Sequence, residues 1–118
     1  MRDDKDNLIV KLTFEFSLGI IEFTEELGLL KKYVFANQIL RAGTSIGANV
    51  KEAQNAESKS DFIHKMKIAA KEADEVEYFL TLCKFSKNYP FNQELLEKLH
   101  SIIRILSKII SSSKTISV

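Results

Sequence analysis

Apolar residues recur every three or four positions along most of this 118-residue chain, and that spacing constrains its fold more than any other feature. Such a period places apolar side chains on one face of an α-helix. The clearest stripe belongs to residues 92–112 and contains Leu95, Leu99, Ile102, Ile103, Leu106, Ile109 and Ile110. Residues 60–87 carry another, made of Phe62, Met66, Ala69, Ala73, Val76, Leu80 and Cys83. Because no segment alternates apolar and polar residues as a half-buried strand does, the sequence predicts an all-α protein.

Residues that stop and start helices divide this pattern. Pro90 is the only proline and ends one helix, and Asn92 can cap the helix that follows. Ser58 or Ser60 can cap a helix whose first turn carries Asp61. The sequence therefore predicts helix breaks near positions 56–60 and 87–91.

Gly28 is placed to end the first helix, so helices are expected at about 6–29, 33–56, 60–87 and 92–112. Short connections make consecutive helices antiparallel neighbours. A chain of this length can also bury one core without disulfides or a structural metal. We therefore expect a single domain over residues 1–118, an up-down-up-down four-helix bundle.

Composition and charge narrow the class of protein. Hydrophobic residues make up 45% of the chain and charged residues 28%, which excludes a wholly disordered protein. The net charge of +1 predicts no overall attraction to nucleic acid, so any basic surface has to come from local arrangement. Cys83 is the only cysteine, which excludes an internal disulfide and a cysteine-based zinc site.

The first ten residues, MRDDKDNLIV, are charged where a signal peptide is apolar, and no apolar run is long enough to span a bilayer. We expect a cytoplasmic protein with no membrane contact, cofactor or metal.

The first helix is apolar on two faces, which predicts burial on both. One stripe suits the core and contains Ile9, Leu12, Phe16, Ile20, Phe23 and Leu27. The other, nearly opposite, contains Val10, Phe14, Leu18 and Ile21. The third helix adds a mixed outer face of His64, Ile68, Glu72, Glu75, Phe79 and Leu82. Because a four-helix monomer leaves such faces in water, these patterns predict a homo-oligomer.

Two glycines interrupt the second helical segment, in the stretch RAGTSIGANVKEAQNAE. Gly43 and Gly47 lie one turn apart, and each costs roughly 1 kcal/mol of helix propensity relative to alanine. Close approach of a neighbouring helix is the compensation that we expect. The alternative, a phosphate-binding glycine loop, requires a preceding strand and a following lysine and hydroxyl residue, none of which is present.

Residues 41–80 resemble a family of four-helix-bundle proteins first associated with intervening sequences in 23S ribosomal RNA genes. The family typically shows Arg-Ala, then Ser-Ile, then an Asn-hydrophobic-x-Glu-Ala/Gly step, then Ser-x-x-Asp/Glu-Phe opening a glutamate-rich third helix. The corresponding residues are Arg41-Ala42, Ser45-Ile46, Asn49-Val50-Lys51-Glu52-Ala53, Ser58 with Asp61-Phe62, and Glu72, Glu75 and Glu77.

The resemblance implies an up-down bundle that assembles as a ring of five. Similar proteins include the accessory variability protein of diversity-generating retroelements, which partners a reverse transcriptase and binds nucleic acid. The resemblance also singles out polar residues that we interpret as a network fixing helix register, with ligand binding as the alternative: Arg41, Ser45, Asn49, Glu52, Asp61, His64 and Glu72. For Arg41, we expect Glu52 or Glu72 as the carboxylate partner.

Three classes of function follow. The first is an oligomer that binds RNA or a ribonucleoprotein, with contacts from Lys65, Lys67, Lys71, Arg104 and Lys108. Scattered lysines on a helix are also typical of a merely solvated face. The second is a protein-binding adaptor or scaffold without nucleic-acid contact.

The third class, an enzyme, is not expected. Glu72 with Glu75, or Glu52 with His64, are candidates for proton transfer. However, the sequence has no nucleophile in a recognisable elbow or triad and no Glu-x-x-His di-iron motif. A metal site at His64 and Glu72 lacks the third and fourth donors that such a site needs.

Overall fold

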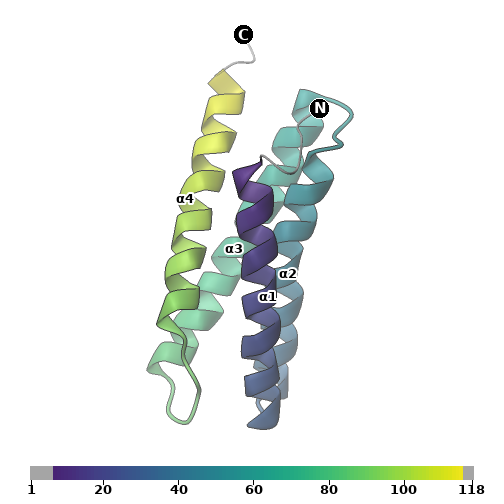
Figure 1. The fold of residues 1–118 in the computed structure, drawn as a ribbon. Coiled ribbons are helices and arrows are strands. Elements are labelled where there is room, and N and C mark those ends of the chain that lie inside the picture. Colours follow the sequence, from purple (N-terminus) through teal and green to yellow (C-terminus); the bar gives the residue numbers. More distant parts are fainter. Residues whose placement is uncertain (1–6, 116–118) are drawn as a thin grey trace.

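The computed structural model describes residues 7–115, which form four α-helices and no strands. They are α1 (Leu8–Leu29), α2 (Tyr33–Ala53), α3 (Lys59–Phe85) and α4 (Gln93–Thr115). Consecutive helices run in opposite directions, and α1 begins at the end of the bundle where α4 finishes (Figure 1). The all-α prediction is confirmed. None of the helices in residues 7–115 combines the length and apolar character needed to cross a membrane.

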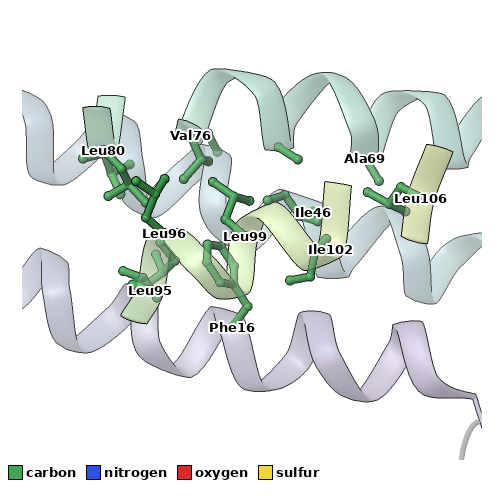
Figure 2. Packing of buried hydrophobic residues seen from close by; sticks show 14 of the residues in the cluster. Phe16, Ile46, Ala69, Val76, Leu80, Leu95, Leu96, Leu99, Ile102 and Leu106 are labelled. Carbon is green, nitrogen blue, oxygen red and sulfur yellow. The ribbon is translucent and has the colours of Figure 1, made fainter. Parts of the chain in front are cut away.

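The core lies between the four helices. Helix α2 packs against α1 and α3, and α4 packs against α3 and, less extensively, against α1. Phe16, Ile46, Val76 and Leu99, one from each helix, meet in this core (Figure 2). Each large apolar side chain buried in this way contributes roughly 1.5–3 kcal/mol.

Two helices start at caps that the sequence predicted. The Oγ of Ser58 accepts a hydrogen bond of 3.0 Å from the backbone N–H of Asp61, so Ser58 rather than Ser60 caps α3. The Oδ1 of Asn92 accepts a 2.9 Å bond from the N–H of Leu95 at the start of α4. Helix α4 then runs to Thr115, three residues beyond the expected end.

The end of α1 differs from the expectation. Gly28 lies within the helix, and the residue with left-handed backbone geometry is Lys31, with φ of 64°. The N–H of Lys32 donates to the carbonyl of Leu27 at 2.9 Å, which closes the terminus as a Schellman motif does. The assignment of Gly28 as the terminator was therefore wrong, because a lysine occupies the position that usually favours glycine.

A buried amide pair joins the start of α1 to the end of α2. Gln54 follows directly after α2, which ends three residues earlier than expected, and is only 3% exposed. Its Oε1 accepts a 2.7 Å bond from Nδ2 of Asn7, and its Nε2 donates a 2.8 Å bond to the carbonyl of Val50. Because both amides are buried and paired, they favour one antiparallel register of α1 and α2.

Candidate functional site

The two glycines of α2 face α1 at a close helix contact. A Cβ at Gly43 would lie 2.8 Å from Cγ1 of Ile20, and one at Gly47 would lie 3.3 Å from both Oγ of Ser17 and the carbonyl oxygen of Thr13. The hydroxyls opposite are paired within α1: Thr13 donates to Ile9 O at 2.8 Å and Ser17 to Thr13 O at 2.9 Å. Gly43 and Gly47 therefore allow α1 and α2 to pack closely, and they do not form a loop around a ligand.

Arg41 links α2 to two carboxylates of α3. Its Nη2 lies 2.7 Å from Oε2 of Glu75, and its Nη1 lies 3.7 Å from Oε1 of Glu72. The longer distance exceeds hydrogen-bonding range, and among residues 7–115 the buried Oε1 of Glu72 has no hydrogen-bond partner. Glu52 is not the partner of Arg41: eleven residues separate them, about 16 Å along a helix. That alternative was wrong, and the reasoning from sequence missed Glu75, one turn beyond Glu72.

The other polar residues singled out by the family resemblance make separate contacts rather than one network. Glu52 lies 3.7 Å from Nζ of Lys65, which is also 3.9 Å from Asp61. Ser45 donates to the carbonyl of Arg41 at 2.7 Å, and Asn49 donates to the carbonyl of Ser45 at 2.8 Å. Of these contacts, only the one between Glu52 and Lys65 joins α2 to α3, whereas those of Ser45 and Asn49 lie within α2 and do not fix the register of the two helices.

His64 takes no part in these contacts. It is exposed and lines a shallow hollow on α3 with Lys59 and Lys67, whereas Glu52 pairs with Lys65. The structure therefore does not bring together the two groups of the Glu52–His64 proton relay. Within residues 7–115, no group of three or more His, Cys, Asp or Glu side chains could hold a metal ion.

Basic side chains gather along the outer face of α3 and α4. Two contacts show the antiparallel register of these helices: Nε2 of His100 lies 2.7 Å from Oε2 of Glu77, and Lys114 approaches Lys67. Lys71, one turn after Lys67, accordingly lies level with Lys108. We call the exposed residues Lys67, Lys71, Arg104 and Lys108 the basic face.

Lys65 lies apart from the basic face. Its contacts with Glu52 and Asp61 place it on the flank of α3 that packs toward α2. Lys67 instead meets Lys114, and the pKa of Lys67 is lowered from 10.5, chiefly because Lys114 hydrogen-bonds to it and also because the two positive charges repel. At the basic face, Lys67 therefore lies near a second positive charge. The charge of Lys65, in contrast, is balanced by the carboxylates of Glu52 and Asp61.

Glu77 lies between α3 and α4 and Asp74 one turn after Lys71, and a further group of acidic side chains gathers elsewhere. A groove of about 530 Å³ between α1 and α4 is lined by Glu22, Glu25, Glu26 and Glu94, with Lys98 at its side. These residues lie in the later turns of α1 and the first turns of α4, away from the end of α4 that carries Lys108 and Lys114. The net charge of +1 thus conceals a separation of charge over the surface.

Three of the four residues predicted for the second apolar stripe of α1 are on the surface of the single chain, whereas Val10 is half-buried and packs against the core. Phe14 is 63% exposed, Leu18 50% and Ile21 42%. Beside Phe14, a largely apolar groove of about 290 Å³ runs between α1 and α2 past Gly47 and Ala48. We call Phe14, Leu18 and Ile21 the apolar face of α1.

Known proteins include relatives that are similar to this chain in sequence and in fold. Residues 5–112 match the model of a family described as 23S rRNA-intervening sequence protein. Among solved structures, the chain is similar to a protein of unknown function from the S23 ribosomal protein family of Bacteroides thetaiotaomicron. The two share 39% sequence identity and a TM-score of 0.83, over 91% of this chain and 98% of the other. No curated protein matches the chain significantly.

Proposed function

The chain belongs to the 23S rRNA-intervening sequence protein family, and on that premise we propose that it is a non-enzymatic, homo-oligomeric protein that binds RNA or a ribonucleoprotein. The observation that carries the proposal is the basic face, where Lys67, Lys71, Arg104 and Lys108 are exposed along two adjacent helices. The family's name, which refers to 23S rRNA, supports RNA as the ligand class.

The arrangement of charge suits binding to phosphates. Lysine and arginine on one face can neutralise consecutive phosphates and release condensed counterions, whatever the net charge of the whole chain. The acidic groove between α1 and α4 would repel the same polymer. Together, these surfaces favour one orientation of RNA, along α3 and α4.

We propose that the apolar face of α1 is a contact between subunits. Phe14, Leu18 and Ile21 are larger and more exposed than a solvated helix face requires, and a groove adjoins them. The family resemblance implies five copies in a ring. Repeating the basic face around such a ring would multiply its contacts with one RNA, so a few lysines per chain would suffice.

No catalytic role is proposed for the polar residues of the family motif, whose Glu72 lies 3.7 Å from Arg41 and whose Glu52 and Asp61 lie 3.7 and 3.9 Å from Lys65. The compartment that we propose is the cytoplasm, where the thiol of Cys83 would remain reduced.

The proposal is tested by titrating a labelled structured fragment of ribosomal RNA, and an unrelated duplex, into the full-length protein at several salt concentrations. We expect binding whose affinity falls steeply with salt, with a log–log slope of about 0.7–0.9 per phosphate contacted. Absence of binding at low salt would contradict the proposal and favour the protein adaptor. Binding that is insensitive to salt would contradict the contact with phosphates.

A further inference from the structure

The outer side of α3 carries exposed side chains along its whole later length. Residues three and four apart lie one above another on a helix. A set of exposed residues follows that spacing, and we call it the α3 stripe: Lys67, Lys71, Asp74, Tyr78, Thr81 and Phe85. The α3 stripe begins with the two lysines that α3 contributes to the basic face and contains two aromatic rings farther on. The basic face therefore continues along α3 into an aromatic segment.

The two rings of the α3 stripe are largely exposed. Tyr78 is 64% exposed and Phe85 is 79% exposed. Phe79, the residue after Tyr78, instead packs inward, and its ring centroid lies 5.4 Å from that of Phe35. Packing of the core therefore accounts for Phe79, whereas Tyr78 and Phe85 present most of their surface to a ligand.

A lysine stands beside the second ring. Nζ of Lys84 lies 5.7 Å from the ring centroid of Phe85 and 5.6 Å from that of Phe91. Such contacts keep a positive charge close to the aromatic surface. Because Lys84 is itself exposed, a phosphate attached to a base on Phe85 would find a counter-charge within reach.

Carboxylates limit where phosphates can lie on the α3 stripe. Asp74 is exposed one turn after Lys71, and its charge would repel a phosphate. The adjoining carboxylates of Glu75 and Glu77 are engaged with side chains of α2 and α4, each at 2.7 Å. Beyond Lys71, the α3 stripe therefore suits uncharged bases better than a sugar–phosphate backbone.

We propose that Tyr78 and Phe85 are stacking platforms for unpaired bases of the bound RNA, whose phosphates lie on the lysines of the α3 stripe. Aromatic rings beside cations hold single strands without regard to sequence, because every base has a π-face. Tyr78 lies about 10 Å along the helix axis from both Lys71 and Phe85, so a strand of a few nucleotides covers this part of the stripe. Bases within a duplex are not available for such stacking. The inference rests on the proposed function and deepens it, because it names a single-stranded segment as the class of RNA.

The first test measures the affinity of the full-length protein for a labelled single-stranded RNA of about twelve nucleotides, and for the duplex of the same sequence. The wild type should prefer the single strand. Tyr78→Ala and Phe85→Ala should each weaken its binding about fivefold or more and leave the salt slope unchanged, because no charge is removed. Tyr78→Phe should retain the affinity, whereas Tyr78→Leu, which keeps apolar surface without a π-face, should not.

Tyr33→Ala is the matched control for Tyr78→Ala. Tyr33 is 58% exposed, close to the value for Tyr78, but it lies in the first turn of α2 and not on the α3 stripe. We expect Tyr33→Ala to bind the single strand within about twofold of the wild type.

The second test observes the contact through fluorescence. The chain has no tryptophan, so Phe85→Trp introduces a single indole. Single-stranded RNA should quench the indole fluorescence saturably, because a base stacks on the ring, and the duplex should leave it nearly unchanged. Tyr33→Trp is the control and should respond to neither.

The results distinguish failure of the stacking from failure of the proposed function. If RNA binds but Tyr78→Ala and Phe85→Ala behave like Tyr33→Ala, the stacking is wrong while the proposed function stands. If these variants lose RNA together with their light-scattering mass, the rings belong to a contact between subunits, and the stacking is again wrong. If the wild type binds neither single-stranded nor duplex RNA, the stacking and the proposed function are both wrong.

Discussion

Gly43 of α2 lies so close to Ile20 of α1 that a Cβ on the glycine would stand 2.8 Å from the isoleucine Cγ1 and Cγ2 atoms. Real Cβ atoms do not approach side-chain carbons so closely, and Ile20 is fully buried and cannot move aside. We therefore predict that Gly43→Ala lowers the free energy of unfolding by about 1–3 kcal/mol, although alanine is the better helix former.

Gly28→Ala provides the control, because Gly28 is also helical but a Cβ added there would meet no atom within 4 Å. This substitution should raise the free energy of unfolding by about 0.5–1 kcal/mol. Both values come from urea denaturation of the same preparation. Equal stabilisation by the two substitutions would show that α1 and α2 are not held in close contact.

The starts of α3 and α4 could be predicted from the sequence, whereas the relative rotation of the helices could not. Ser58 and Asn92 act within one turn, so local spacing was enough to identify them as caps. The pairing of Arg41 with Glu75 depends on how α2 and α3 are rotated and staggered, which packing decides. Lys65 was grouped with Lys67 as an RNA contact for the same reason, because spacing along α3 does not reveal that Lys65 faces α2.

The contact of His100 with Glu77 and the acidic groove also escaped prediction. Both arise where two helices meet, and nothing in the spacing along either helix specifies the partner across the gap. For the same reason, the sequence placed Phe14, Leu18 and Ile21 on a second face of α1 but could not identify the groove beside them.

The contacts of Arg41 predict a specific coupling with Glu72. Replacing Arg41 by Met should destabilise the protein by up to about 1 kcal/mol, because it removes the half-exposed positive charge 3.7 Å from the partly buried Glu72 carboxylate. Adding Glu72→Gln should recover most of that loss, since a neutral amide costs less to bury. A double-mutant cycle measures the coupling, and strictly additive effects would contradict a structural role for this pair.

Cys83 is predicted to be chemically inert in the folded protein. Its burial raises the pKa of the thiol from 9.0 to about 11, and the thiolate is the reactive form. At pH 8 the folded protein should therefore react with iodoacetamide about a hundredfold more slowly than the unfolded chain. Comparable rates in the two states would show that the thiol is accessible.

The same pKa shift predicts a dependence of stability on pH. Between pH 9.0 and about 11 the unfolded state loses the thiol proton while the folded state retains it, so the stability contributed by Cys83 is complete below this range and declines through it. Because lysines and tyrosines titrate nearby, the measurement is the difference in unfolding free energy between wild type and Cys83→Ala. A difference that does not change with pH would contradict the raised pKa.

Assembly through the apolar face of α1 predicts a change of mass on substitution. The wild type should show a light-scattering mass several times 13.4 kDa, and Phe14→Glu should reduce it toward that of one chain, because a carboxylate would be buried in the contact. Phe85→Glu serves as the control, since Phe85 is 79% exposed at the end of α3. Dissociation by Phe85→Glu alone would assign the contact to a different surface.

The most direct test of the central claim compares RNA affinity between two variants of equal net charge. One replaces the basic face, Lys67, Lys71, Arg104 and Lys108, by glutamine; the other replaces Lys11, Lys31, Lys87 and Lys98, which lie outside it. If RNA lies along α3 and α4, the first variant should lose most of its affinity and of its salt dependence between about 50 and 200 mM salt, and the second should retain both. Equal losses in the two variants would contradict a localised site, because binding would then follow net charge alone.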